Sequence, residues 1–272
     1  MDDFLLAALK EDIGTGDITT LSCVPANGVS KGRFIAKAAG VICGIDILKR
    51  VFALLDEAVI IDSCVKDGAS VGRGDVICEI GGPSVSILTG ERVALNIVQR
   101  LSGIATRTSE AVFAVKGLGT RIADTRKSTP GLRVLEKYAV RVGGGHNHRF
   151  NLADGVLIKD NHIKAAGGIK AAVEAVCRLA PHTLRIEVET ETMDEVSEAL
   201  AAGADIIMLD NMSPDMMSQA VRLCKGKALT EASGNMGERD LRQVAETGVD
   251  IISIGALTHS VTALDISLKF YA

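Results

Sequence analysis

The chain has 272 residues, of which 47% are hydrophobic, 24% charged and 3% aromatic, and its formal net charge is -4. An acidic chain without Trp is a poor general polyanion binder and offers little for stacking on bases, so a nucleic-acid-binding function is disfavoured. The length suits one barrel domain or a barrel with a smaller partner, and it is sufficient to bury a core.

The lack of a secretory signal and the spacing of the cysteines predict a cytoplasmic location for the protein. The segment from Met1 to Phe4 lacks the basic and apolar regions of a secretory signal, and no apolar run is long enough to span a bilayer, so no membrane association is expected. The cysteines show no C-x-x-C spacing and most lie in apolar surroundings, which predicts buried, reduced thiols at Cys23, Cys43, Cys64, Cys78, Cys177 and Cys224.

The first hundred residues predict a small domain of short elements. We expect a helix over 4–10, a Gly- and Asp-rich turn over 11–20, a strand over 32–38 and a helix over 47–55. Residues 59–83 read as hairpins with glycine turns. These hairpins are similar to domains that carry biotin or lipoate, but no Lys stands at a hairpin tip, so the likeness is structural only.

A longer helix is expected from Thr89 to Ile104, with Glu91 and Arg92 at its start. The helix dipole favours acidic residues at this end, so it does not explain Arg92. Arg92 is therefore a candidate for binding an anionic ligand.

Beyond about Thr106, apolar strands alternate with amphipathic helices. Strands are predicted over 121–125, 155–159, 184–189, 205–210, 227–231 and 250–254, and helices over 169–179, 193–202, 216–223 and 238–246. This alternation indicates parallel strands joined by crossovers, closed or nearly closed into a barrel, although the pattern alone also allows an open doubly wound sheet.

A cation-rich stretch runs from Asp124 to His162. We expect a helix over 131–142, followed by three glycines that can bring the backbone close to a ligand. Like charges ~6 Å apart at an effective dielectric of ~20 repel by roughly 2 to 3 kcal/mol, so converging cations predict a site for anions. The cations are Arg121, Arg126, Lys127, Arg133, Lys137, Arg141, Arg149 and Lys159.

Charged and small residues end each predicted barrel strand, and strand ends of a barrel meet at one mouth. Cations come first and carboxylates follow, which suits a substrate with anionic groups on one side and a developing positive charge or a metal on the other. These strand-end residues are Arg126, Lys127, Lys159, Asp160, Glu187, Glu189, Asp210, Asn211, Glu231, Ser233, Gly234, Gly255 and Ala256.

Several short motifs carry a family resemblance. Asp124-Thr125-Arg126-Lys127 with Pro130-Gly131, Glu136 to Val140, Gly143-Gly144-Gly145 with Asn147-His148-Arg149, and Ile158 to His162 resemble quinolinate phosphoribosyltransferase nearly end to end. The resemblance implies a type II phosphoribosyltransferase-like α/β barrel over 106–264. It also implies an N-terminal α/β sandwich domain over 1–105, which about 265–272 rejoin.

The implied reaction transfers phosphoribose from phosphoribosyl pyrophosphate to quinolinate with decarboxylation, giving nicotinate mononucleotide for NAD biosynthesis. Arg pairs carboxylates bidentately, so quinolinate is assigned to Arg126, His148, Arg149 and Arg92 of a partner chain. Lys127 and Lys159 are assigned to the pyrophosphate and ribose side. Glu189 and Asp210 are expected to hold Mg²⁺ or the ribose hydroxyls.

The 5′-phosphate is assigned to glycine-containing loops at the last two strand ends, where barrels often bind phosphate. Asn235 stands where some relatives have a second glycine, and Asn tolerates a left-handed backbone. The loop residues are Ser233, Gly234, Asn235, Gly255 and Ala256. The family also implies a homodimer with shared sites, or a higher oligomer.

Four alternatives remain at this point. They are a Schiff-base aldolase using Lys159, a paralogue linked to molybdate transport, a non-catalytic scaffold, and a zinc site of His146, His148 and Asp160. The intact Arg126-Lys127 and His148-Arg149 motifs disfavour the paralogue. His162 is expected to cap or pack, and His259 either starts a helix or lies at the site rim.

Overall fold

The computed structural model describes residues 1–271, with the side chain of Ser63 excepted, and it divides into two compact units. The N-terminal unit comprises Met1–Ser109, Val134–Gly143 and Val261 onward, and the barrel unit comprises Glu110–Arg133 and Gly144–Ser260. Residues 106–109, 134–143 and 261–264 were expected in the barrel, whereas their contacts join them to the N-terminal unit. Ala272, the end of the expected return segment, lies outside the described residues.

The N-terminal unit contains helices packed against an antiparallel sheet. Its elements are α1 (Asp2–Ile13), α2 (Ile18–Cys23), β1 (Val29–Ala36), β2 (Gly40–Val41), α3 (Ile45–Leu55), β3 (Ile60–Ser63), β4 (Ser70–Val71), β5 (Val76–Pro83), α4 (Ser84–Ala114, in this unit to Ser109), α5 (Arg133–Val142, from Val134) and β12 (Ile266–Tyr271).

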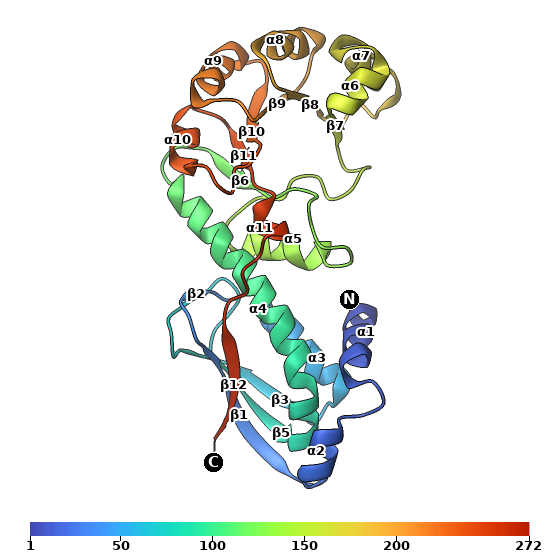
Figure 1. Cartoon of the computed structure of the whole chain (residues 1–272), viewed down its shortest axis with the longest axis vertical. Coiled ribbons are helices and arrows are strands. Elements are labelled where there is room, and N and C mark those ends of the chain that lie inside the picture. The colour runs from blue at the N-terminus through green and yellow to red at the C-terminus, as the bar shows by residue number, and fades with distance from the viewer. Residues whose placement is uncertain (272) are drawn as a thin grey trace. The chain divides into compact units, whose positions relative to one another are not determined.

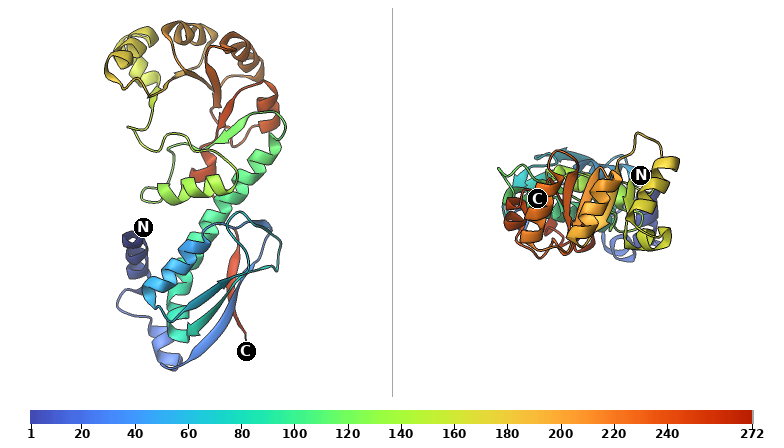
Figure 2. Two further views of the ribbon diagram at one scale, coloured as in Figure 1. Left: turned by 180° about the vertical axis from the view of Figure 1, so that it is seen from behind. Right: turned by 90° about the horizontal axis from the view of Figure 1, so that it is seen from above.

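The main sheet of this unit has the strand order β12-β1-β5-β3, and helices α3 and α4 lie over one face of it (Figures 1 and 2). Buried side chains alternate along β1, where Phe34 and Ala36 face the helices. Phe34 makes an edge-to-face contact with Phe52 of α3, with ring centroids 6.3 Å apart. This aromatic contact packs helix α3 against the sheet.

Two local predictions in this unit had the wrong bounds. The turn expected over 11–20 is confined to 14–17, because α1 extends to Ile13 and the Asp17 side chain caps α2 by accepting the Thr20 N–H at 2.9 Å. Helix α4 begins at Ser84, not at Thr89. Arg92 therefore lies in the third turn of α4, and the dipole argument for it does not apply.

Helix α5 belongs to the N-terminal unit because its side chains are buried there. Glu136 is fully buried and pairs with Arg100 of α4 at 2.7 Å, and the Tyr138 hydroxyl donates to Asp67 at 2.7 Å. A Cβ on Gly143 would come within 2.7 Å of the Thr108 Cβ. Gly143 therefore brings the backbone close to helix α4, not to a ligand as the glycine run suggested.

The barrel unit contains six parallel strands in the order β6-β11-β10-β9-β8-β7. Its strands are β6 (Arg121–Ala123), β7 (Val156–Ile158), β8 (Ile186–Thr190), β9 (Ile206–Asp210), β10 (Leu229–Ser233) and β11 (Ile251–Ser253). Its helices are α6 (Asp160–Ala166), α7 (Ile169–Leu179), α8 (Met193–Ala202), α9 (Pro214–Cys224), α10 (Leu241–Glu246) and α11 (Ala256–His259).

Helices α6 to α10 form an outer layer around the curved sheet (Figures 1 and 2). The loop after α5 extends the sheet beyond β6, where His146 forms a parallel bridge with Ala123. The hydrogen-bonded order does not join β6 to β7 directly. The unit is a barrel-like parallel sheet, as the alternating pattern predicted.

The strand register separates an outer apolar face from an inner polar one. Side chains on alternate strand positions point to opposite faces. Val188, Ile207, Leu209, Ala232 and Ile252 are fully buried on the face that the helices cover. The inner face carries Glu187 and Glu189, paired in register with Ile206 and Met208, and also Asp210, Glu231, Ser233 and Ser253.

Within residues 1–271, we find no helix with both the length and the apolar character needed to cross a bilayer.

Candidate active site

The carboxyl ends of the barrel strands bring charged side chains together at one rim. Lys159 follows β7, and its Nζ pairs with the Glu189 carboxylate on the neighbouring strand β8. Asp210 ends β9 and accepts a hydrogen bond of 2.7 Å from the side chain of Asn211. Lys159 is 45% exposed while Glu189 is only 13% exposed, so the ammonium faces the opening and covers the acid.

Lys127 reaches the same rim from the loop after β6. Its backbone carbonyl accepts a 2.8 Å bond from the Thr258 hydroxyl, which fixes the loop to helix α11. A Cβ on Gly255 would lie 3.0 Å from Lys127 Cδ and 3.1 Å from the His259 ring. Gly255 therefore leaves room for the side chains of Lys127 and His259, and His259 ends helix α11 and does not start a helix.

The loop after β10 is shaped by close approach to Asn211. A Cβ on Gly234 would overlap the Asn211 side chain and lie 2.7 Å from its backbone nitrogen, and Gly234 has φ +88°. Asn235 adopts φ 53°, the left-handed conformation that Asn tolerates. Ser233, Gly234 and Asn235 thus form a tight turn beside Asp210, with which Ser233 is paired in register.

Asp124 organises the segment that carries His148. This fully buried carboxylate accepts the His148 N–H at 2.8 Å and the Asn147 side-chain amide at 2.6 Å. The backbone bonds from His146 to Ile122 and from Asp124 to His146 hold the same segment against β6. Asp124 is a positioning residue that the motif contained but whose role sequence reasoning missed.

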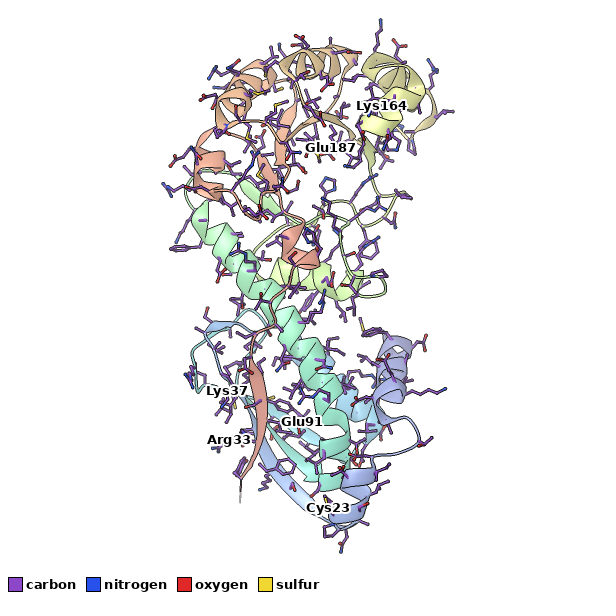
Figure 3. The ribbon with its side chains drawn as sticks, in the orientation of Figure 1. Cys23, Arg33, Lys37, Glu91, Lys164 and Glu187 are labelled. Carbon is purple, nitrogen blue, oxygen red and sulfur yellow. The ribbon has the colours of Figure 1, made fainter. Side chains whose placement is uncertain are left out.

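His148 and two buried glutamates form a cluster inside the barrel. His148 Nε2 lies 3.1 Å from Glu187 Oε2 and 3.6 Å from Glu231 Oε1. His148 Nδ1 accepts the Arg149 N–H at 2.8 Å, so we assign the proton to Nε2, which donates to Glu187. Figure 3 labels Glu187 on the concave side of the sheet and Lys164 on the outer helix α6. Alternation along β8, where Glu187 and Glu189 are two residues apart, was the available signal for Glu187.

Arg126 lies close enough to Arg149 to affect the pKa of Arg149. Burial and the nearby charge of Arg126 lower the pKa of Arg149, while Glu187 opposes this shift. Arg149 also donates to the Gly155 carbonyl at 2.9 Å. Arg126 Nε is buried and has no hydrogen-bond partner among the described residues, which suits a ligand that supplies acceptors.

A cavity of about 430 Å³ lies within the barrel unit below the rim. Its polar lining includes His148, Arg149, Glu187 and Glu231, and its apolar lining includes Ile206 and Ile251. Arg121 and Arg185 lie at its other end, on or just before the starts of β6 and β8. The cavity thus extends from the buried cluster toward the amino ends of the strands.

Two groups of side chains can be compared as possible metal ligands. The ligand atoms of His148, Glu187 and Glu231 lie within 4.8 Å of one another. A metal on Nε2 would require the other ring nitrogen to carry the proton, yet Nδ1 already accepts the Arg149 N–H, so this cluster does not fit a metal. The zinc set of His146, His148 and Asp160 is likewise not among the clusters that the described residues form.

Glu189 and Asp210 fit a hard cation better. They stand on adjacent strands, on the same inner face and at the rim, and carboxylate oxygens are the ligands that Mg²⁺ prefers. His162, as expected, caps helix α6, since its Nδ1 accepts the Lys159 N–H at 2.9 Å. Arg92 is exposed and lies in the N-terminal unit, so the barrel unit alone does not contain it.

Fold and site together define an α/β-barrel protein whose strand ends carry cations beside acids. Two family descriptions match almost the whole chain: Quinolinate phosphoribosyl transferase, N-terminal domain, over residues 17–102, and its C-terminal domain, over residues 104–269. The chain belongs to the quinolinate phosphoribosyltransferase family.

Individual relatives are similar to this chain over nearly their full lengths. A Bacillus subtilis protein named probable nicotinate-nucleotide pyrophosphorylase (carboxylating) is 50% identical over 258 residues, covering 95% of this chain and 89% of the relative. The crystal structure of NadC from Streptococcus pyogenes is 44% identical with a TM-score of 0.92, covering 100% of this chain and 97% of that one. A nicotinate-nucleotide pyrophosphorylase from Francisella tularensis is 41% identical with a TM-score of 0.95, covering 99% and 95%.

Proposed function

We propose that this protein transfers the phosphoribosyl group of phosphoribosyl pyrophosphate to quinolinate, with release of pyrophosphate and CO₂, to form nicotinate mononucleotide for NAD biosynthesis. The observation that carries this proposal is the linked set of charges in the barrel unit. The charges of Arg126 and Glu187 both affect the pKa of Arg149. Glu187 also contacts His148, and Lys159 pairs with Glu189. Family membership supports the same reaction.

Quinolinate carries two carboxylates, and the cationic side of the site is suited to them. Arg126 has an unpaired buried Nε, and Arg149 is partly buried, so a carboxylate would satisfy donors that the protein leaves open. Hydrogen bonds between charged groups contribute about 1.5 to 3 kcal/mol each. His148 lies beside them and orients the bound ring by its fixed position between Glu187 and Arg149.

Phosphoribosyl pyrophosphate is assigned to the rim. Lys127 and Lys159 face the opening, where they balance the charge of the leaving pyrophosphate. The 5′-phosphate is assigned to the turns of Ser233-Gly234-Asn235 and Gly255-Ala256, where the absence of a Cβ keeps the backbone accessible. As the ribose C1 acquires positive charge, Glu189 and Asp210 stabilise it through their carboxylates.

Mg²⁺ is the cofactor that this donor set suits, with Glu189 and Asp210 as the proposed protein ligands. When bound, it would neutralise diphosphate charge and so aid departure of pyrophosphate. The remaining catalysis is positioning and electrostatics, because attack by the ring nitrogen at C1 needs no protein nucleophile.

Loss of CO₂ follows from the product of the transfer step. Ribosylation leaves a positive charge on the ring nitrogen, which stabilises the electron pair left at the adjacent C2 when the C–C bond breaks. The cations that held the first carboxylate release it as neutral CO₂, while the second carboxylate stays bound. No further cofactor is needed for this step.

We further propose a cytoplasmic homodimer, or a higher oligomer, with shared sites. Arg92 is exposed on α4 and would enter the partner's site to contact a quinolinate carboxylate. The family resemblance supports this arrangement, and the absence of Arg92 from the barrel unit is consistent with it.

The aldolase alternative is less well supported. A Schiff-base lysine requires a pKa lowered by apolar burial or cationic neighbours. Lys159 is instead 45% exposed and paired with Glu189. Borohydride trapping with a carbonyl substrate should give no adduct at Lys159.

The decisive assay supplies phosphoribosyl pyrophosphate and Mg²⁺ with either quinolinate or nicotinate. We expect nicotinate mononucleotide and CO₂ in equal amounts from quinolinate, and no CO₂ with nicotinate. Chelation of Mg²⁺ should stop turnover and its return should restore it. Failure to consume quinolinate under these conditions would refute the assignment.

A further inference from the structure

Glu231 is a buried acid that has no role in the function proposed above. It lies on β10 in the middle of the inner face, two residues before Ser233, and only 1% of it is exposed. Its register partners are Met208 on β9 and Ile251 on β11, whose side chains are apolar. A carboxylate in such a position is costly unless it is paired or protonated.

Pairing does not account for Glu231. Its Oε1 atom is buried without a hydrogen-bond partner in the part of the chain that the structure describes, and the nearest cationic candidate, His148 Nε2, is 3.6 Å away and directed to Glu187. Glu231 is one of the residues that line the 430 Å³ cavity, together with Arg149 and His148. Glu231 therefore faces the space beside the groups to which we assign quinolinate.

Its surroundings favour the neutral acid. Burial is the largest cause that raises the pKa of Glu231, and the charge of Glu187 on β8 raises it further, whereas His148 and Lys159 lower it. The Ser253 hydroxyl on β11 also lowers this pKa, because it lies close to the carboxylate. A carboxylic acid held protonated near neutral pH can donate its proton to a bound ligand.

The proposed reaction requires one proton at this place. Breaking the bond between C2 and its carboxylate leaves an electron pair on C2, and nicotinate mononucleotide carries hydrogen there. The proton has to come from a group or a water molecule in contact with C2. Lys159 is already paired with Glu189, and both ring nitrogens of His148 are engaged.

We propose that Glu231 is the catalytic acid that protonates C2 after CO₂ leaves, and that the cavity beneath it admits the water that restores its proton. This inference rests on the proposed function. The C–C bond breaks and its electron pair stays on C2, CO₂ departs, and the pair takes the proton of Glu231 to form the C–H bond. The Glu231 carboxylate then regains a proton from water, and no oxidant or reductant is consumed.

The reverse of this step can be measured alone. Nicotinate mononucleotide bound to the enzyme in D₂O, without CO₂ or pyrophosphate, should exchange its C2 hydrogen for deuterium, because Glu231 as a carboxylate can remove that proton. Proton NMR follows the loss of the C2 signal. Glu231→Gln should slow exchange by about 10²-fold, the lower end of the usual contribution of a general acid or base. Glu174→Gln, on the exposed surface of α7, is the matched control and should exchange at the wild-type rate.

Folding and binding have to be separated from chemistry. Calorimetric titration with nicotinate mononucleotide should show that Glu231→Gln still binds it, since the chain has no Trp for a fluorescence assay. Unchanged exchange in a folded, binding-competent Glu231→Gln protein would overturn the proposal.

If Glu231→Gln does not fold, a measurement on the wild-type enzyme can still test the role of Glu231. Exchange through Glu231 should rise with pH as the acid ionises and then level off. Attack by hydroxide would instead rise about tenfold per pH unit without a plateau. A missing plateau, or no exchange by an enzyme that releases CO₂ from quinolinate, would overturn the inference. Absence of CO₂ release would count against the proposed function itself.

Discussion

His148 and Glu187 are joined by a contact of 3.1 Å between Nε2 and Oε2, while the other ring nitrogen accepts the N–H of Arg149. The imidazole is therefore fixed at both ends. Glu187 also provides the negative charge that offsets the repulsion between Arg126 and Arg149. One carboxylate thus positions a ring and balances two cations.

These two tasks can be separated by substitution. Glu187→Gln keeps an acceptor for His148 and removes a negative charge that repels the quinolinate carboxylates, so we expect a severalfold fall in KM for quinolinate with His148 still oriented. Glu187→Leu removes both and leaves the His148 N–H unpaired, which costs about 1 to 3 kcal/mol. Nitrogen NMR of the imidazole and steady-state kinetics check this. Identical behaviour of the two variants would contradict the division of roles.

Lys159 and Arg126 should be required for turnover and not for folding. Lys159→Ala and Arg126→Ala are each expected to reduce formation of nicotinate mononucleotide by at least about 10²-fold, because each removes a charge placed against a substrate anion. Circular dichroism should be unchanged, since both side chains are only partly buried. Near-normal product release from either variant would remove the basis for these roles.

Gly234 should be sensitive to an added methyl group. Gly234→Ala combines a left-handed backbone with overlap on Asn211, so we expect a loss of stability of about 1 to 3 kcal/mol and weaker binding of phosphoribosyl pyrophosphate. Gly167→Ala is the matched control, because Gly167 has the same φ of +88° but open space around its Cβ. It should lose stability through the backbone alone and keep its affinity. Urea unfolding and calorimetry would compare them.

Stability should depend on pH through Glu231. Its pKa is raised from 4.5 to about 7 by burial and by Glu187. Between these values the folded protein keeps a proton that the unfolded chain has lost, so the free energy of unfolding falls as the pH rises through this window. The expected contribution is on the order of 3 kcal/mol. Urea unfolding of Glu231→Gln across the same range should lack this fall, and an unaltered slope would exclude Glu231 as its source.

The proposed sharing of sites between subunits predicts complementation between inactive variants. Arg92→Ala and Lys159→Ala should each be inactive alone, yet mixing them under subunit exchange should restore activity, because a hybrid dimer contains one site with both native residues. At random pairing about half of the dimers are hybrids, so recovery should approach about one quarter of wild-type activity. Two Lys159→Ala preparations mixed together are the control. No recovery would argue against Arg92 entering a partner's site.

The sequence was most informative where periodicity was strong. The inner acids at strand ends and helix α8 over 193–202 follow directly from alternation and from the 3.6-residue period. The start of α4 was missed because Ser84 to Leu88 continue a strand-like apolar run, and the helix signal becomes clear only later. The roles of Asp124, Asn211 and Glu231 depend on contacts between distant segments, which local patterns do not encode.

Strand β12 has a consequence for how the protein is made. It pairs with β1 from Lys31 opposite Tyr271 to Ala36 opposite Ile266, so two neighbouring strands are separated by more than two hundred residues of chain. During synthesis β1 emerges early and keeps one edge unpaired until the whole barrel has been translated. Such an edge is an aggregation hazard, so the nascent chain should depend on chaperones until its last strand leaves the ribosome.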